Sequence, residues 1–412
     1  MNNHLADKPV SGLSTDLART GEHIGITWDL IHMLEHNGEM KSLLEKAIRQ
    51  GWETIPDPDC NPVQDLESYY AFIDRICTSL PWDINPTTKF TRPFDKVNQS
   101  MGCFYYIADQ PLDELADRGY FHNSLVYHEP YRTWFNRMVA EFGMFLTTED
   151  SWNGEAYAYA CTEPEFHLED GLYEDAENWK TFNDFFARRL RDPSLRPIAA
   201  PEDDKVVTAP ADAWPQGLWQ IDADSRIITT PEDPIEGIAI KTGTLTSVPA
   251  LLGNTEYREA FAGGMLTHIF LDTNDYHRYH FPVSGTIKEV YMIPASNGPG
   301  GVIVWEKKLN RYKEYHSDVV GWQSIETRGV IIMETVTGRL CAIIPVGMCQ
   351  VSSVNFEETV VPGAVVKKGD PMGCFLFGGS DIIMIFAGDA GFEMTAEAHE
   401  HLNMGEEYGR LK

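Results

Sequence analysis

The chain has few positive charges for its 412 residues: 33 Lys and Arg stand against 62 Asp and Glu, a formal net charge of -29. Nucleic acids and anionic membrane surfaces are themselves negative, so this balance argues against both as partners. The sequence also lacks the ~18 consecutive apolar residues of a membrane span and an apolar signal-peptide core at its start. We therefore expect a cytoplasmic protein with no nucleic-acid partner and no stable membrane insertion.

Cysteine is scarce as well, and the seven cysteines are far apart, with no CxxC pair among them. An odd number at wide spacing argues against a disulfide framework, and the short spacing of a zinc site is absent. We expect reduced thiols and no metal site. The cysteines are Cys60, Cys77, Cys103, Cys161, Cys341, Cys349 and Cys374.

The first half of the chain carries helical patterns. Residues 40–49, 66–80 and 130–146 place apolar side chains at helical spacing. A further helix is expected over 181–190, where Thr181 is suited to the N-cap and an aspartate three positions later suits the first turn. These patterns predict a mainly helical N-terminal domain over residues 1–175.

After about Pro197 the pattern changes to short β-type runs, such as GTIKEVYMI at 285–293 and DIIMIF at 381–386. Gly, Pro, Asn and Asp separate these runs, which is typical of a sandwich or barrel and not of βαβ units. The fold class we expect is therefore α+β, with a β-rich catalytic domain over residues 176–412.

A serine after two glycines, Gly378-Gly379-Ser380, is the first candidate for chemistry. Small residues before a serine allow a tight turn that exposes the hydroxyl to the preceding carbonyl. A simple turn is the commoner meaning of such a tripeptide. The GxSxG pattern of hydrolases is not present, because Ile382 stands two residues after the serine.

Two histidines three residues apart, His277 and His280 in DYHRYH, form the second candidate. Histidine is the side chain best matched to proton transfer near neutral pH, although a structural pair explains the spacing equally well. A metal pair lacks an evident third ligand nearby. Asp212, which follows Pro210, is either a turn aspartate or a carboxylate that orients a histidine.

In their order along the chain, six segments resemble the phosphatidylserine decarboxylase family of pyruvoyl enzymes, over about residues 177–390. Residues 130–153 further resemble the N-terminal region of a soluble branch that includes fungal tryptophan decarboxylases. The six segments are FNDFFARRLRDPSLRPI, VVTAPADA, IKTGTLTSVPALLG, FAGGMLTHIFLDTNDYHRYHFPVSGTI, IIPVGMCQVSSV and VVKKGDPMGCFLFGGSDIIMIF.

The resemblance implies a proenzyme that cuts itself between Gly379 and Ser380. The Ser380 hydroxyl attacks the Gly379 carbonyl, and β-elimination of the resulting ester leaves a dehydroalanine. This residue tautomerises and loses ammonia by hydrolysis, which gives a covalent pyruvoyl cofactor derived from Ser380. By resemblance, His280 is the base of this reaction and Asp212 is the carboxylate that orients it. His277 is assigned to protonating the substrate α-carbon in the mature enzyme.

The implied activity is that of a carboxy-lyase, which binds a substrate amine to the pyruvoyl group as a Schiff base and releases CO2. The acidic, soluble character and the resemblance of residues 130–153 favour a free amino acid, aromatic, with L-tryptophan as the first choice. The alternatives are a phosphatidylserine decarboxylase that makes phosphatidylethanolamine, and a scaffold that is never cut. A homodimer fits the resemblance.

Two departures from the family pattern bear on the substrate. Ala213 stands where the family commonly has a glycine, which leaves Asp212 in place. The stretch IPASNGPGGVIV at 293–304 replaces the PGxLFSVN-like segment of the membrane enzymes, so lipid head-group recognition does not follow from the resemblance.

Overall fold

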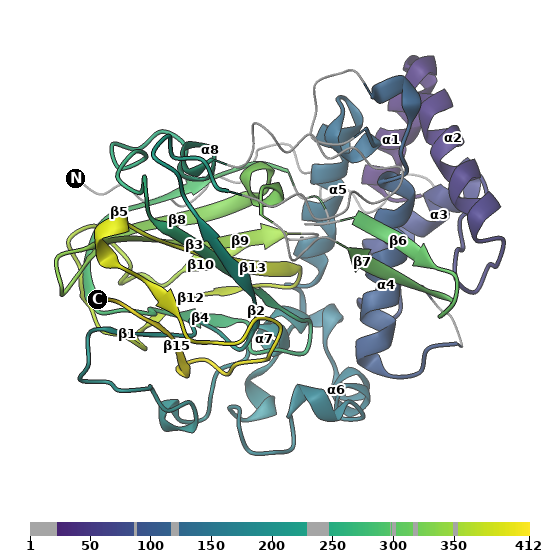
Figure 1. Cartoon of the computed structure of the whole chain (residues 1–412). Helices are drawn as coiled ribbons and strands as arrows, with labels where there is room; N and C mark the ends of the chain where they lie inside the picture. The colour runs from purple at the N-terminus through teal and green to yellow at the C-terminus, as the bar shows by residue number, and fades with distance from the viewer. Residues whose placement is uncertain are drawn as a thin grey trace, which may run out of the picture.

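A computed structural model describes residues 23–85, 89–116, 123–228, 247–296, 298, 302–315, 320–348 and 353–412. The start of the chain, and parts of the segments IKTGTLTSVPALLG, IPASNGPGGVIV and IIPVGMCQVSSV, lie outside these residues. Within the described ranges, α1 to α7 precede residue 187 and the strands follow residue 205, which confirms the α+β class. Figure 1 shows the helices gathered on one side of the molecule and the sheets on the other.

The helical part is built around an aromatic-rich core, to which every one of its α-helices contributes. These helices are α1 (Gly25–His36), α2 (Gly38–Thr54), α3 (Leu66–Ile76), α4 (Pro93–Ala108), α5 (Tyr131–Phe145), α6 (Gly154–Ala160) and α7 (Phe182–Phe186). The predicted helices over 40–49, 66–80 and 130–146 are confirmed as α2, α3 and α5.

The helix expected over 181–190 is shorter than predicted. Its start is confirmed: the Asp184 N–H donates to the Thr181 hydroxyl at 3.1 Å, and the Asp184 carboxylate accepts from the Thr181 N–H at 3.0 Å. The helix ends at Phe186, because the next residue leaves the helical conformation. Phe182 and Phe186 belong to the helical core, which therefore extends beyond the predicted domain boundary at 175.

The β-rich part contains a seven-stranded sheet in the order β11-β5-β8-β9-β13-β3-β2. Two three-stranded sheets, β10-β12-β4 and β1-β15-β14, and a separate β6-β7 hairpin complete it, with the short helix α8 (Val248–Leu252). The strands of the large sheet are β2 (Trp214–Gln220), β3 (Met265–Leu271), β5 (Gly285–Ile293), β8 (Thr327–Thr335), β9 (Leu340–Met348), β11 (Val365–Val366) and β13 (Gly379–Phe386). The others are β1 (Val206–Thr208), β4 (Arg278–His280), β6 (Val302–Glu306), β7 (Arg311–Tyr315), β10 (Val354–Phe356), β12 (Pro371–Phe375), β14 (Glu393–Met394) and β15 (Glu407–Arg410).

The strand that carries Ser380 is held on both sides. In β13, Ser380 lies opposite Leu271 of β3 and opposite Gly347 of β9, both antiparallel. Because side chains alternate along a strand, Ile382 and Ile383 pack into two different cores on the two faces of the sheet. Burial on both faces explains the uninterrupted apolar run after Asp381 and fixes the register of the strand.

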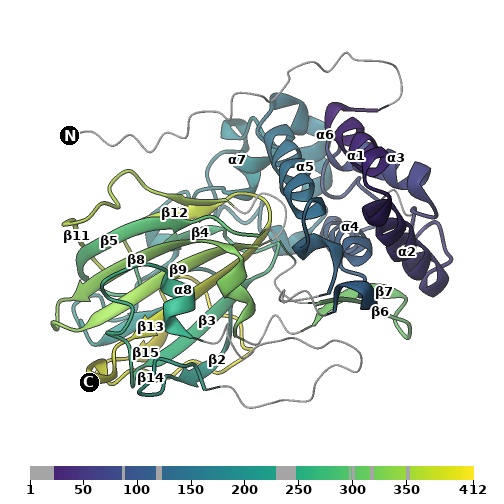
Figure 2. The same ribbon diagram turned by 90° about the horizontal axis from the view of Figure 1, so that it is seen from above.

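The β6-β7 hairpin departs from the sheets and packs against α4 (Figures 1 and 2). Tyr312 of the hairpin donates its hydroxyl to the Cys60 carbonyl at 2.9 Å, and its backbone N–H donates to the Gln99 side chain at 2.7 Å. The close approach requires Gly102 of α4, because a Cβ atom there would lie 2.4 Å from the Cβ of Tyr312. The hairpin is thus part of the helical layer, although it comes from the second half of the chain.

We expect Gly102→Ala to destabilise the fold by about 1–3 kcal/mol, the usual cost of overpacking a tight contact. The added methyl group would push the β6-β7 hairpin away from α4. Urea unfolding measures the effect, and Gly38→Ala is the matched control, because nothing lies within 4 Å of its added methyl group. Equal stability of the two variants would show that the hairpin does not depend on this contact.

Candidate active site

Ser380 is fully buried, and its hydroxyl oxygen has no hydrogen-bond partner among the described residues. An unpartnered buried hydroxyl is costly, which makes such a group a candidate for chemistry. The residue two positions earlier, Gly378, has a φ of 152°, a conformation that favours glycine. The chain therefore turns at Phe377 and Gly378, whereas Gly379 is already the first residue of the strand β13.

The turn is anchored in the helical layer by Phe377. This ring packs edge-on against Phe182 and Phe186 of α7, with centroids 5.3 and 5.2 Å away. Its backbone N–H donates to the side chain of Asn183 at 3.0 Å. The helix α7 thus positions the backbone that leads into the Gly379–Ser380 bond.

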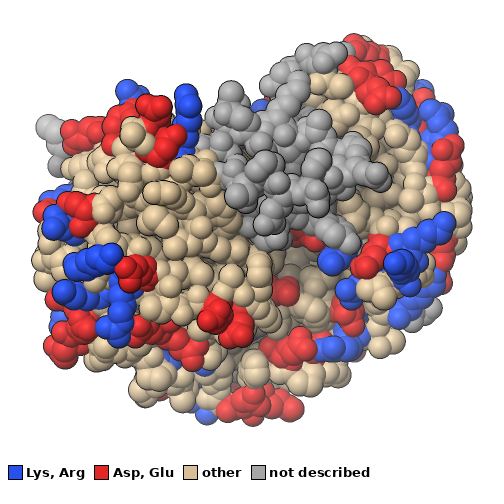
Figure 3. Space-filling model, viewed as in Figure 1, with Lys and Arg blue, Asp and Glu red and all other residues tan. Residues whose placement is uncertain are grey.

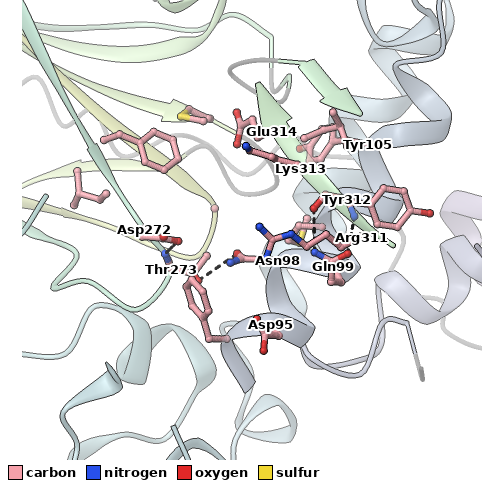
Figure 4. Close-up of a pocket in the computed structure, with 18 of the residues that line it drawn as sticks. Asp95, Asn98, Gln99, Tyr105, Asp272, Thr273, Arg311, Tyr312, Lys313 and Glu314 are labelled. Atoms are coloured by element: carbon pink, nitrogen blue, oxygen red, sulfur yellow. Dashed lines mark hydrogen bonds between the residues drawn. The ribbon is translucent and has the colours of Figure 1, made fainter. Parts of the chain in front are cut away.

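A cavity of about 400 Å³ opens beside this bond, between the end of the large sheet and the helical layer. Leu271, Met348, Phe377 and Gly378 line its sheet side, and the first two lie directly opposite Ser380 and Gly379 in the strand ladder. Residues of α4 and of β7 form the other wall, including Asn98, Gln99, Tyr105, Arg311, Tyr312, Lys313 and Glu314. Figure 4 shows these residues facing Asp272 and Thr273 across the cavity.

His280 is buried and is held in one tautomer. Its Nδ1 atom lies 2.9 Å from the Gly369 carbonyl, which can only accept, so Nδ1 carries the proton. The Nε2 atom is then free to accept from the Tyr276 hydroxyl, 3.2 Å away. Burial lowers the pKa of His280, while the nearby charge of Asp212 acts in the opposite direction. The ring is therefore a neutral base at neutral pH.

Asp212 does not contact His280 directly, in contrast to the expected orienting hydrogen bond. Its carboxylate accepts two hydrogen bonds from Arg196, at 3.0 and 2.5 Å, and one from the Met404 N–H at 2.7 Å. Arg196 lies in the loop between α7 and β1, and no role in the site was predicted for it from the sequence. The carboxylate acts on His280 through its charge and not through a shared proton.

His277 is almost completely buried, at 1% exposure. Its ring stacks on Phe186 with centroids 3.8 Å apart, and its Nδ1 atom donates to the Asp275 carbonyl at 2.9 Å. Burial holds its pKa well below the ordinary value, so the ring is neutral. The ring lines neither the cavity beside Ser380 nor the second cavity described next.

A second, more polar cavity of about 300 Å³ contains Asp212, Arg196 and Asp275. The Asp275 carboxylate accepts from His401 Nε2 at 2.9 Å, and this contact raises the pKa of His401. Asp272 and Phe94 line both cavities. The C-terminal part of the chain thus supplies one histidine, His401, to the surroundings of the site.

Comparison with known proteins gives one family. Residues 182–410 match the family model for phosphatidylserine decarboxylase. The match covers more than half of the chain and contains Ser380, both histidines and Asp212. The chain belongs to the phosphatidylserine decarboxylase family. Members of this family are pyruvoyl-dependent carboxy-lyases, made as proenzymes whose cofactor derives from a serine of their own chain.

Individual relatives agree with this assignment. The chain is 33% identical over 222 residues to phosphatidylserine decarboxylase proenzyme 2 of Oryza sativa subsp. japonica, covering 54% of this chain but 31% of that one. It is 27% identical over 286 residues to the phosphatidylserine decarboxylase proenzyme of Shewanella frigidimarina, covering 66% of this chain and 91% of that one. The Anaeromyxobacter proenzyme is 28% identical over 252 residues, or 57% of this chain and 80% of that one.

The residues around Ser380 fit the pyruvoyl group of the family. The Ser380 hydroxyl is buried and has no partner among the described residues, the residue before it is Gly379, and Gly378 lines a cavity beside that bond. The helices α1 to α6 lie outside the range that the family model matches, and α4 forms one wall of this cavity. No helix in the described part of the chain is long and apolar enough to cross a membrane.

Several polar residues line the two cavities although no role was predicted for them from the sequence: Arg196, Asp272, Asp275, Tyr276, Glu314 and His401. Among them, Asp272 has a pKa raised to about 7 by burial and by the charge of Asp275. Glu314 has a pKa raised to about 8, by burial first and by Asp272 next. Asp275 could have been selected from the sequence, because it precedes the two histidines in DTNDYH, whereas nothing in the residues around Glu314 distinguishes it.

The described residues contain no group of three or more His, Cys, Asp or Glu side chains placed to hold a metal ion.

Proposed function

We propose that this chain is a self-processing, pyruvoyl-dependent decarboxylase that is cut between Gly379 and Ser380. In this proposal residues 176–412 form the catalytic domain, and the helical residues before them close one side of the substrate cavity. The observation that carries the proposal is the buried Ser380 hydroxyl beside that cavity, which has no hydrogen-bond partner in the described part of the chain.

In the cutting reaction, the Ser380 hydroxyl attacks the Gly379 carbonyl, and the amide nitrogen leaves to give an ester. His280 acts as the base that accepts a proton at Nε2, because its Nδ1 proton is engaged by the Gly369 carbonyl. Asp212, whose charge raises the proton affinity of His280, stabilises the ring once it is protonated. Removal of the α-proton then eliminates the ester and separates residues 1–379 from 380–412.

The pyruvoyl group, once formed, supplies a ketone that condenses with the substrate amine and an acceptor for the electrons released with CO2. The protein excludes water and orients the substrate in the cavity between β3, α4 and β7.

The substrate that the comparisons favour is phosphatidylserine, which gives phosphatidylethanolamine. The sequence by itself favoured a free aromatic amino acid, but the relatives named above are phosphatidylserine decarboxylase proenzymes. Two positively charged side chains line the cavity, Arg311 and Lys313, and they are suited to bind the phosphodiester of a lipid head group.

A free aromatic amino acid, with L-tryptophan as the first choice, is the second candidate. The observation that favours it is the lining of the cavity, which contains aromatic rings suited to pack against one aromatic side chain. These rings belong to Phe94, Tyr105, Phe270, Tyr312 and Phe377. The surface adds to this. Among the described residues on the face seen in Figure 3, Lys and Arg are interspersed with Asp and Glu and form no continuous basic area for an anionic membrane.

One assay separates the candidates. The purified, cut protein is given phosphatidylserine in neutral detergent micelles, L-serine or L-tryptophan, and CO2 release and the amine product are measured. Turnover of phosphatidylserine alone supports the lipid substrate, and turnover of L-tryptophan alone supports the second candidate. A cut protein that turns over none of the three would contradict both substrates.

A further inference from the structure

A half-buried glutamate in the substrate cavity has no role in the cutting reaction. Glu314, on β7, lines the same cavity as Gly378 and Phe377, directly before the bond that is cut. Its Oε1 atom is buried and has no hydrogen-bond partner among the described residues. In Figure 4, Glu314 and Lys313 project from β7 toward the side of the cavity where Asp272 lies.

The charge at the start of β13 affects the pKa of this carboxyl group. The charge of Asp381, the residue directly after Ser380, acts on Glu314, as do those of Asp272 and Asp109. Asp381 becomes the second residue of the small fragment when the chain is cut, and Ser380 becomes its modified first residue. Glu314 therefore shares the cavity with the residues that lead into the Gly379–Ser380 bond, and it responds to the charge at the start of β13.

Decarboxylation consumes one proton in each turnover. The bond from the substrate α-carbon to the carboxylate breaks, CO2 leaves, and the electron pair that remains must take up a proton at that carbon. A neutral carboxylic acid facing the cavity is suited to deliver it, and solvent can then restore the acid.

We propose that Glu314 is the catalytic acid that delivers this proton to the substrate α-carbon. The inference rests on the proposed decarboxylase function and replaces the assignment of His277 to the same step. The histidine is less suited, because its ring lines neither cavity and is packed against Phe186.

The protonation state of Glu314 agrees with this role. Burial raises its pKa to about 8, so the group is mainly neutral at pH 7 and loses its proton as the pH rises through 8. The facing acids Asp272, Asp381 and Asp109 act in the same direction, and Lys313 lies beside it in the cavity lining. Asp272 is a weaker candidate for the acid, because its Oδ1 atom already accepts from the Thr273 N–H at 2.8 Å.

The test compares Glu314→Gln with Glu334→Gln, which makes the same change at an ion pair on the surface of β8. Both proteins should be cut normally and carry the pyruvoyl group, as shown by the intact mass of the small fragment. With phosphatidylserine and L-tryptophan as probes, kcat of Glu314→Gln should fall by roughly 10²-fold or more, the usual contribution of a positioned acid. We expect kcat of the parent to decline above pH 8, and this decline should be absent in Glu314→Gln.

A second readout does not depend on the rate. Without its donor, the α-carbon is protonated less often and the proton arrives instead at the carbon contributed by Ser380. Hydrolysis then releases an aldehyde and leaves alanine at the start of the small fragment. Mass spectrometry after incubation with substrate should show this alanine accumulating faster per turnover in Glu314→Gln than in the parent or the control.

The outcomes distinguish a failure of the proposed function from a failure of the role given to Glu314. An uncut parent chain, or one without the pyruvoyl group, would overturn the proposed function together with this inference. A parent that turns over substrate while Glu314→Gln keeps its kcat within about twofold, a change too small for a lost catalytic acid, would overturn the inference alone. The same holds if alanine accumulates in His277→Gln and not in Glu314→Gln.

Discussion

Ser380→Ala is expected to leave a single uncut chain of 412 residues with no decarboxylase activity toward any substrate. The hydroxyl oxygen is both the nucleophile and the atom whose elimination separates the two fragments, so no other group can replace it. Intact mass under denaturing conditions measures the cutting, and reaction with a carbonyl reagent such as phenylhydrazine measures the pyruvoyl group. Two fragments meeting at residues 379 and 380 in this variant would contradict the mechanism.

The same substitution should not destabilise the fold. Because the Ser380 hydroxyl has no partner among the described residues, its removal relieves a buried polar group and is expected to change the free energy of unfolding by no more than about 1 kcal/mol. Ser42→Ala, at an exposed serine of α2, is the matched control and should be cut normally. A large loss of stability in Ser380→Ala would mean that the missing cut reflects a damaged fold.

His280→Gln is expected to slow self-cutting by roughly 10²–10⁴-fold, the range for loss of a positioned base. Glutamine can still donate to the Gly369 carbonyl but has no basic nitrogen in place of Nε2. The variant is produced and its fragments are followed by gel and by mass over days. His32→Gln, an exposed histidine of α1, is the control, and normal cutting of His280→Gln would remove His280 from the role of base.

The pH dependence of cutting gives an independent check on His280. Burial lowers the pKa of this ring, so the neutral, basic form persists below the ordinary histidine range. We expect freshly denatured and refolded precursor to be cut at pH 6 nearly as fast as at pH 7.5, with the rate falling at lower pH. A rate that halves near pH 6.5 would indicate a solvent-exposed base instead.

The cavity beside Ser380 combines residues from inside and from outside the range that the family model matches. The relatives named here are phosphatidylserine decarboxylase proenzymes, whereas the family model begins at residue 182. In this chain α4, which lies outside the range that the family model matches, and β7, which lies inside it, form one wall of the cavity. The three-substrate assay measures which substrate this cavity accepts.

Local features of this protein followed from residues near one another in the chain. The helix start at Thr181 needs only Asp184 three residues later, and the apolar run after Asp381 predicts a strand. The turn at Gly378 depends on the absence of a side chain, because its φ favours glycine. Such features are set by periodicity, capping and steric freedom over short spans, and each is present in the structure.

The surroundings of Ser380 could not be read in the same way, because they join residues that are distant in sequence. Asp212 was expected to bind His280 and instead binds Arg196, and His401 reaches Asp275 across 126 positions. Glu314 owes its raised pKa to desolvation where the β6-β7 hairpin meets the end of the sheet. Burial and the field of distant charges are properties of the packed molecule, so the protonation states of this site arise only when the helical layer and the sheet come together.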